Sequence, residues 1–216
     1  MKQQIINTGQ DSDNTPHKIH LKLRITTESL QRFFSLLSIG FSINAKAGYS
    51  INDLLSRELG IAKAYIDDRI QTIFLNGKAV DDSKSATLQE GDVVALSAAM
   101  PGMVGSTFRK GGFFAGMRSQ ISHLTDTAAP QDHQQIKVKL KLFNLVAKEL
   151  GPVFLEKGVI IDGNTFQKFV SEKLEDLKAI FSSIDLNGTK ISFDRLKEFK
   201  WADREVLLQV TTEKYC

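Results

Sequence analysis

The chain has 216 residues and a formal net charge of +3, with 42% hydrophobic and 25% charged residues, proportions that are typical of a soluble globular protein. The net charge is too small to indicate a nucleic-acid partner, and no run of about 18 apolar residues predicts a membrane-spanning helix. The only cysteine is Cys216, which excludes a disulfide framework or a cysteine metal site within one chain. We therefore predict a cytoplasmic protein that binds neither nucleic acid nor a membrane.

Residues 1–16 are polar and lack the apolar region of a secretory signal, so we predict a disordered tail. From residue 17 onward, apolar and polar residues alternate. This predicts a half-buried strand whose inner face is Ile19, Leu21, Leu23 and Ile25. A helical spacing follows at Leu30, Phe33, Phe34 and Leu37. A second alternating stretch predicts another strand, with its apolar positions at Phe41, Ile43 and Ala45.

The stretch from residue 48 to 102 carries the clearest local signals. Ser50 and Asp53 are spaced as a capping box at a helix start, and Asn76-Gly77 is the dipeptide best suited to a tight hairpin turn. Another turn is predicted at Gly91-Asp92, followed by a buried strand at 93–96. The predicted order from 17 to 102 is strand, short helix, strand, helix, strand, turn and strand.

This order resembles the ubiquitin-like β-grasp fold. It is most similar to the small sulfur carriers of molybdopterin and thiamine biosynthesis, the MoaD/ThiS group. The likeness is carried by residues 50–55, by Leu75-Asn76-Gly77, and by residues 88–96 with their Glu-Gly-Asp. The resemblance implies an α+β fold and a link to molybdenum- or tungsten-cofactor synthesis or to sulfur metabolism.

The second half of the chain repeats the plan of the first. Residues 136–142 alternate again, and a short amphipathic helix follows that Gly151-Pro152 is predicted to close. After a strand at 159–161, Thr165 is predicted to cap a longer helix.

The turn signals recur as well. Asn187-Gly188 repeats the Asn-Gly turn, and Asp203 with its following strand repeats Asp92 and its strand. We interpret the chain as two tandem β-grasp domains, at 17–102 and 135–216, each burying its own core, joined by a glycine-rich basic linker at 103–134.

Sulfur carriers of this group present a C-terminal Gly-Gly whose carboxylate is adenylated by an activating enzyme and converted to a thiocarboxylate. The resemblance implies that this tail would end near Gly102, and a glycine pair follows at Gly111 and Gly112, but the chain continues past both positions. Sulfur transfer would therefore require proteolytic processing. Non-catalytic partner binding is our first hypothesis, and an active carrier ending at Gly102 or Gly112 is the alternative.

The glycine-rich segment contains phenylalanines and cations, and no acidic residue occurs from residue 93 to 125. Apolar side chains in such number need a surface to cover them. They either fold back onto a sheet or dock on a protein partner, such as an adenylating or cofactor-synthesis enzyme, with the cations at the rim. The candidate residues are Phe108, Arg109, Lys110, Phe113, Phe114 and Arg118.

No pattern for catalysis or for a cofactor is present. The glycines at 102 and 105 lack the lysine of a phosphate-binding loop. The four histidines lack metal-ligand spacing, and no Ser/His/Asp or Cys/His arrangement can be traced. We therefore predict a protein that is not an enzyme and holds neither metal nor cofactor.

Overall fold

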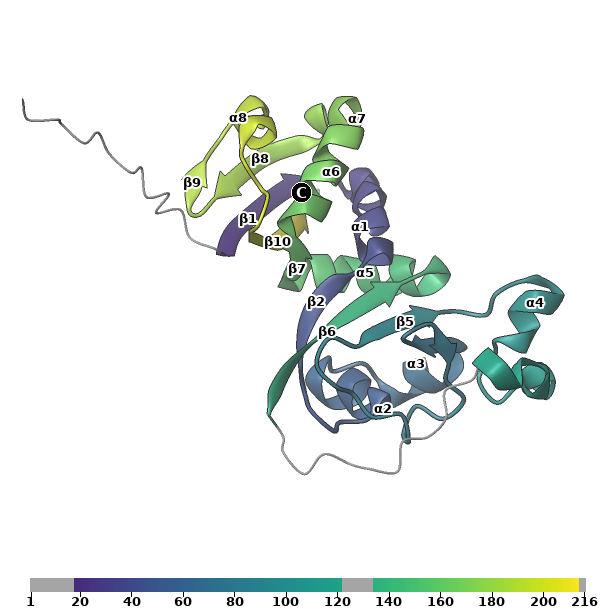
Figure 1. Ribbon diagram of the computed structural model, residues 1–216. Coiled ribbons are helices and arrows are strands. Elements are labelled where there is room, and N and C mark those ends of the chain that lie inside the picture. Colours follow the sequence, from purple (N-terminus) through teal and green to yellow (C-terminus); the bar gives the residue numbers. More distant parts are fainter. Residues whose placement is uncertain (1–17, 122–133, 214–216) are drawn as a thin grey trace, which may run out of the picture.

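The computed structural model describes residues 18–121 and 134–213. Within these residues the chain is an α+β protein built on one mixed sheet of ten strands (Figure 1). The predicted tail at 1–16 and residues 122–133 of the predicted linker lie outside the described residues.

The elements of the first half follow the predicted order. They are β1 (Lys18–Ile25), η1 (Thr27–Phe33), α1 (Phe34–Ile39), β2 (Phe41–Lys46), α2 (Ile51–Asp53), η2 (Leu54–Glu58), α3 (Lys63–Asp68), β3 (Thr72–Leu75), β4 (Lys78–Ala79) and β5 (Val93–Ser97). Two short helices come next, α4 (Gly102–Thr107) and η3 (Phe113–Ile121).

The second half begins with a strand of the same character as β1. Its elements are β6 (Gln135–Leu142), α5 (Asn144–Lys157), β7 (Val159–Asp162), α6 (Gly163–Glu172), α7 (Leu174–Lys178), β8 (Phe181–Leu186), β9 (Thr189–Lys190), α8 (Phe193–Glu198) and β10 (Glu205–Thr212).

The two halves of the chain exchange their first strands. The strand order is β4-β3-β5-β6-β2-β7-β10-β1-β8-β9, so β6 lies between two strands of the first half and β1 lies between two strands of the second. β6 pairs parallel with β5 and antiparallel with β2, while β1 pairs parallel with β10 and antiparallel with β8. The expectation that 17–102 and 135–216 each complete a sheet of their own is corrected by this pairing.

The Asn-Gly turns have the predicted left-handed backbone and also locate the exchange. Asn76 and Asn187 both have φ of 51°, and the glycines that follow them have φ of 79° and 85°, as a tight hairpin turn requires. The Asn76 Oδ1 accepts the N–H of Val93 in β5 at 2.9 Å, whereas the Asn187 Oδ1 accepts the N–H of His20 in β1 at 2.8 Å. β1 therefore pairs with β8 in the second half in the way that β5 pairs with β3 in the first half. The predicted equivalence of β10 with β5 is wrong in position, because β10 lies one strand further away.

Two helix boundaries also differ from the predictions. Helix α5 continues through Gly151 and Pro152 to Lys157. A Cβ at Gly151 would lie 2.8 Å from Cδ1 of Leu37, so this glycine lets α1 pack closely on α5 rather than ending the helix. Helix α6 is capped by Asp162, whose Oδ1 accepts the N–H of Thr165 at 2.9 Å; Thr165 is the donor to the cap and not the cap itself.

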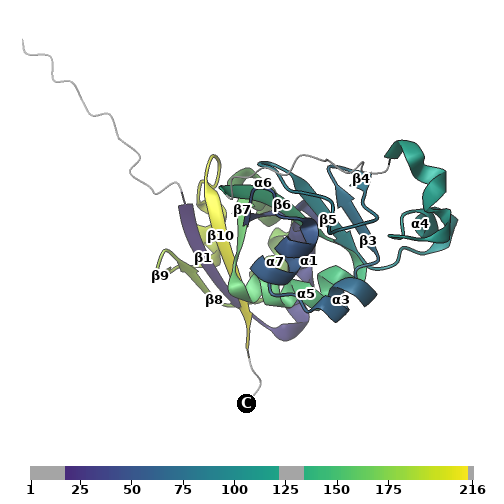
Figure 2. The same cartoon turned by 90° about the horizontal axis from the view of Figure 1, so that it is seen from below.

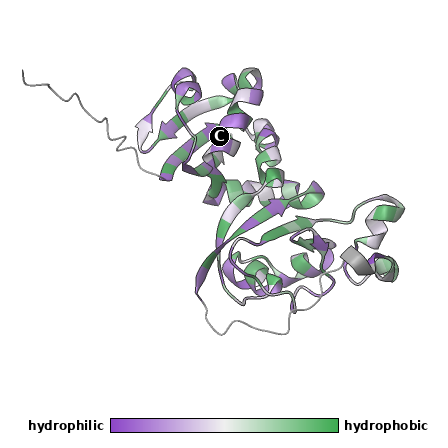
Figure 3. Cartoon of the chain, in the orientation of Figure 1, coloured by the Kyte–Doolittle hydropathy of each residue, from purple (hydrophilic) through white to green (hydrophobic). Residues whose placement is uncertain are grey.

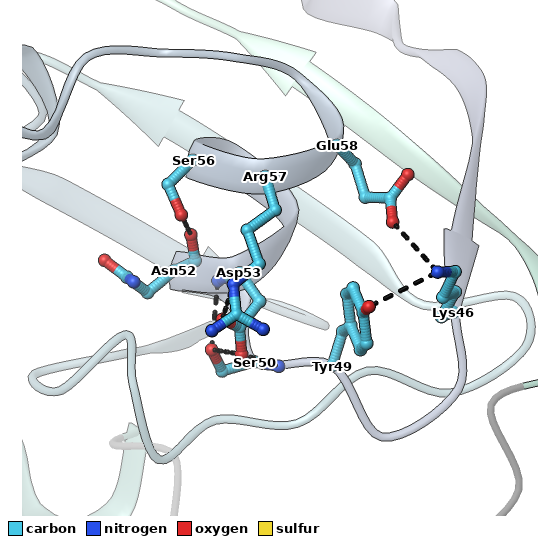
Figure 4. Close-up of polar contacts among 8 residues, drawn as sticks. All are labelled: Lys46, Tyr49, Ser50, Asn52, Asp53, Ser56, Arg57 and Glu58. Carbon is cyan, nitrogen blue, oxygen red and sulfur yellow. Dashed lines mark hydrogen bonds and ion pairs between the residues drawn. The ribbon is translucent and has the colours of Figure 1, made fainter.

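The predicted capping box at the start of α2 is confirmed (Figure 4). The Ser50 Oγ accepts the N–H of Asp53 at 3.0 Å, and the Asp53 carboxylate accepts the N–H of Ser50 at 3.3 Å. Arg57 lies one turn further on and pairs with Asp53 at 3.2 Å. This end of the helix is therefore fixed by local sequence alone, which explains why it could be predicted.

The sheet has one covered face and one open face. Figure 2 shows α1, α3, α5 and α7 lying over the strands on one side. The apolar residues of β1 and β6 point to this inner face and are buried, and their polar residues point to the outer face. Figure 3 shows the resulting alternation of hydrophobic and hydrophilic residues along both strands. The inner face and the helices share one continuous core that includes residues of both halves.

Disulfide trapping tests the exchange. Lys22 of β1 lies directly opposite Asp185 of β8, where Cα atoms are about 4.5–5.5 Å apart, within disulfide range. In a Cys216→Ser background, Lys22→Cys with Asp185→Cys should form an intramolecular disulfide, detected by mass and by mobility on a non-reducing gel.

The matched control is Lys22→Cys with Val93→Cys. Val93 faces Lys139, the β6 counterpart of Lys22, so this control pair should crosslink only if β1 lies beside β5. Crosslinking of the control pair instead of the test pair would contradict the exchange.

Candidate functional site

The segment 102–118 connects β5 to the linker and folds as two short helices that contact each other, α4 and η3. It projects from one end of the molecule, beyond β3 and β5 (Figures 1 and 2). Gly105 allows the tight start of this unit, because a Cβ there would lie 2.4 Å from the carbonyl oxygen of Met100. This segment, most of which was predicted to belong to a linker, is thus a packed helical unit.

A buried arginine ties the segment to the sheet. Arg118 is only 4% exposed, and its guanidinium donates to the Asp81 carboxylate and to the carbonyl of Thr107, each at 2.5 Å. The same carboxylate oxygen accepts the N–H of Gly111 at 2.8 Å. Asp81 therefore holds both helices of the segment at once. The pairing of Asp81 with Arg118 could not be predicted from local patterns, because the two residues lie 37 positions apart.

The other two candidate cations also bind within the protein. The Arg109 Nε donates to the side chain of Gln71 at 2.9 Å. The Lys110 Nζ donates to the carbonyl of Ile66 at 2.6 Å, and burial lowers the pKa of Lys110 from its ordinary value. These cations anchor the segment 102–118 to the end of α3, which is a different role from the predicted rim of a partner interface.

The three candidate phenylalanines divide into two kinds. Phe108 packs against Phe74 of β3, with ring centroids 5.3 Å apart, so it folds back onto the sheet. Phe113 is 95% exposed and meets the ring of Phe114 edge-on at 5.1 Å. Phe108 therefore takes the first of the two predicted fates, whereas docking of the exposed Phe113 on a partner stays a prediction.

The exposed apolar side chains of α4 and η3 form what we call the apolar knob: Met103, Val104, Phe113, Phe114 and Met117. Met103 is 83% exposed, Met117 76% and Val104 71%. Isolated exposed apolar residues are ordinary, but several large ones on one projecting unit indicate a contact surface. The sequence analysis placed only two of these five among its candidates.

A groove of about 590 Å³ lies beside the knob on the outer face of the sheet. We call it the sheet groove; it is lined by Phe74, Gly77, Val93, Ala95, Ser97, Met100, Phe108, Lys141, Phe143 and Asn144. Its walls are mainly apolar, with Lys141 as the one lining residue that carries a formal charge. The sequence analysis did not single out this groove, because β6 enters it from the other half of the chain.

The three glycines of the possible carrier tail lie inside folded structure. Gly102 begins α4 with φ of 83°. Gly111 has φ of 59° and donates its N–H to Asp81, and the N–H of Gly112 donates to the carbonyl of Arg109 at 3.0 Å. None of the three glycines forms an extended tail in the part of the chain that the structure describes.

A polar cluster joins the two halves on the helix side. Arg69 pairs with Glu149 of α5, and the Tyr65 hydroxyl donates to the same carboxylate at 2.7 Å. The hydrogen bond from Arg69 lowers the pKa of Glu149, while burial raises that of Tyr65. Both shifts move the pKa away from neutral pH, so neither group is suited to proton transfer there. The cluster is best explained as a set of contacts that joins the two halves.

Among residues 18–121 and 134–213, no group of three or more histidine, cysteine or acidic side chains is placed to hold a metal ion. In the same residues, every helix is too short or too polar to cross a membrane. Comparison with protein-family models, with curated proteins and with solved structures finds no match to this chain.

The role of Arg118 can be tested by proteolysis. Arg118→Met removes the buried guanidinium that donates to the carbonyl of Thr107 and to Asp81, which costs about 1–3 kcal/mol. The segment 102–118 should then open more often and be cleaved roughly 5- to 150-fold faster by a protease of low specificity. Arg109→Met is the matched comparison: it removes an exposed hydrogen bond to Gln71 that water can replace, so it should raise the rate less than Arg118→Met does. Equal cleavage rates for wild type and Arg118→Met would contradict the tethering role.

Proposed function

We propose that this chain is a non-catalytic, MoaD/ThiS-like protein-interaction module that binds its partner through the apolar knob. The observation that carries the proposal is the exposure of five large apolar side chains on a unit that Arg118 and Asp81 hold in place. Covering a side chain of this size gains about 1.5–3 kcal/mol. A preorganised surface loses little conformational entropy on binding, so more of that gain appears as affinity.

The sheet groove supports the same proposal. It adjoins the knob through Phe108 and Met100, so the two surfaces together offer both a projection and a hollow. Interfaces commonly centre on aromatic anchors that are surrounded by weaker contacts. A partner that covers the knob and reaches into the groove would bury apolar surface on both.

The β-grasp part of the proposal rests on element order. From β1 to β5 the chain runs strand, short helices, strand, capped helix, strand, Asn-Gly turn and strand, the order on which the resemblance was based. β5 also pairs in parallel with the first strand of a half, but that strand is β6, which begins the second half of the chain. We therefore describe the chain as two intertwined β-grasp-like halves rather than two separate tandem domains.

The partner class follows from the resemblance alone. Relatives of this group would bind an adenylating enzyme or a cofactor-synthesis enzyme, which links the chain to molybdenum- or tungsten-cofactor synthesis or to sulfur metabolism. We propose no nucleic acid, membrane, metal or cofactor for this activity, and we propose the cytoplasm as its location.

An active sulfur carrier is the second candidate. It requires cleavage after Gly102 or Gly112; Gly102 begins α4, and Gly112 lies between α4 and η3, next to Gly111 whose N–H donates to Asp81. A carboxylate released there would have to leave this packing before it could enter an activating enzyme. The fold therefore supports the interaction module over the carrier.

Two matched phenylalanine variants test the interaction module. Phe113→Ser removes an exposed anchor and should leave the unfolding midpoint unchanged, while it weakens partner capture from native lysate about 10- to 100-fold. Phe108→Ser removes a packed ring and should lower the free energy of unfolding by about 2–4 kcal/mol. Full partner capture by a Phe113→Ser and Met117→Ser double variant would contradict a role for the knob.

The intact mass of the protein isolated from its native host tests the carrier. We expect the full-length chain. A product that ends at Gly102 or Gly112, with or without the mass change of a thiocarboxylate, would favour the carrier instead.

A further inference from the structure

We propose that the outer face of the sheet binds an acidic polypeptide segment through two parallel rows of cations, one on β1 and one on β6. This surface is separate from the apolar knob, so the inference goes beyond the proposed function. We call the two rows the basic stripes: Lys18, Lys22 and Arg24 on β1, and Lys137, Lys139 and Lys141 on β6.

The stripes follow from the same alternation that builds the core. On both strands every second side chain is buried against the helices, so the intervening cations must point to the outer face. All six are exposed except Lys141, which is partly covered where it lines the sheet groove. Solubility requires polar residues at these positions, but it does not require that they carry one sign of charge.

The strand order sets the distance between the stripes. β6 and β1 are separated by β2, β7 and β10, which makes four strand spacings, or about 19 Å at the usual spacing between neighbouring strands. Both stripes belong to one continuous sheet, so their separation does not depend on a flexible linker. A ligand must therefore be long enough to span them in order to use both.

Few of these charges are satisfied within the protein. Lys137 pairs with Glu205 of β10 at 2.5 Å. Among the described residues, Lys22, Arg24, Lys139 and Lys141 make no ion pair. On the β1 side, Lys22, Arg24 and Lys190 line a hollow of about 360 Å³. Its walls also carry the hydroxyl of Ser183, which can donate to a carboxylate, while the Thr211 hydroxyl donates to the carbonyl of Leu23 at 3.4 Å. Asp185 is the one acidic residue that lines the hollow.

The surface between the stripes favours a polypeptide over nucleic acid. Half-buried Ile160 of β7 and Leu207 of β10 lie opposite each other there, and they offer contacts to aliphatic side chains. The strands β2, β7 and β10 present no outward phenylalanine, tyrosine or tryptophan, so single-stranded nucleic acid finds no stacking platform between the stripes. A net charge of +3 for the whole chain is also low for a nucleic-acid-binding protein.

The test uses fluorescein-labelled oligoglutamate peptides of four and twelve residues, titrated with the full chain at low ionic strength. Fully extended, they reach about 14 Å and about 42 Å, so only the longer peptide can span both stripes. We expect the longer peptide to bind at least about tenfold more tightly because its second contact is intramolecular. Lys139→Glu with Lys141→Glu, and separately Lys22→Glu with Arg24→Glu, should each abolish that advantage.

The control variant makes an equal change in net charge, but on the helix-covered side of the sheet. Lys148→Glu with Lys178→Glu alters exposed lysines of α5 and α7 and should leave the length advantage intact, as should Phe113→Ser in the knob. Milder Lys→Gln and Arg→Gln versions of the stripe pairs serve if a charge reversal disturbs folding, which the unfolding midpoint reports.

Three results would overturn the proposal. The first is a length advantage that survives both stripe variants. The second is an equal loss in the α5 and α7 control, which would reduce the effect to net charge. The third is tighter binding of a DNA duplex of matched charge that the same stripe variants abolish, which would assign the surface to nucleic acid.

Discussion

The pairing of β1 with β8 and β10 is the constraint on which the rest of the structure depends. Without β1 the second half has no strand between β10 and β8, and without β6 the first half has none between β5 and β2. Each half therefore buries its core only with a strand from the other. The link between β2 and β7 and the tie from Arg69 to Glu149 add contacts across the same boundary. The two halves therefore share strands, a core and a polar contact across their boundary.

Local signals in the sequence predicted local structure well. The capping box at Ser50, the left-handed Asn-Gly turns and the alternating strands are each decided by residues only a few positions apart. The exchange could not be predicted in that way. β1 and β6 carry the same alternation of buried and exposed residues, so either strand suits either place, and only tertiary contacts decide between them. The continuation of α5 through Pro152 could not be predicted for the same reason. It depends on the packing of Gly151 against α1, a tertiary contact that the neighbouring sequence does not indicate.

The segment that was predicted to bind a partner carries the apolar knob, and several of its candidate residues make contacts within the protein. Because 102–118 contains cations but no acidic residue, its cations were predicted to lie at an interface. In the structure, Arg118 donates to Asp81 and Lys110 donates to a backbone carbonyl. Composition shows that a segment is basic, but it does not show which distant carboxylate or carbonyl will meet each cation. The phenylalanines divide between the two fates that were considered for them. Phe108 took the available place on Phe74, and Phe113 was left outside.

The exchange also determines which surfaces the molecule can offer. Because β6 enters the first half, Lys141 and Phe143 complete the sheet groove beside the knob. Because β1 enters the second half, its cations meet Lys190 across β8 instead of lying beside β5. The pairing of β2 with β7 joins the two halves into one sheet. The exchange therefore decides which stripe lies in which half, while the pairing of β2 with β7 places both stripes on one face, where one ligand can reach both.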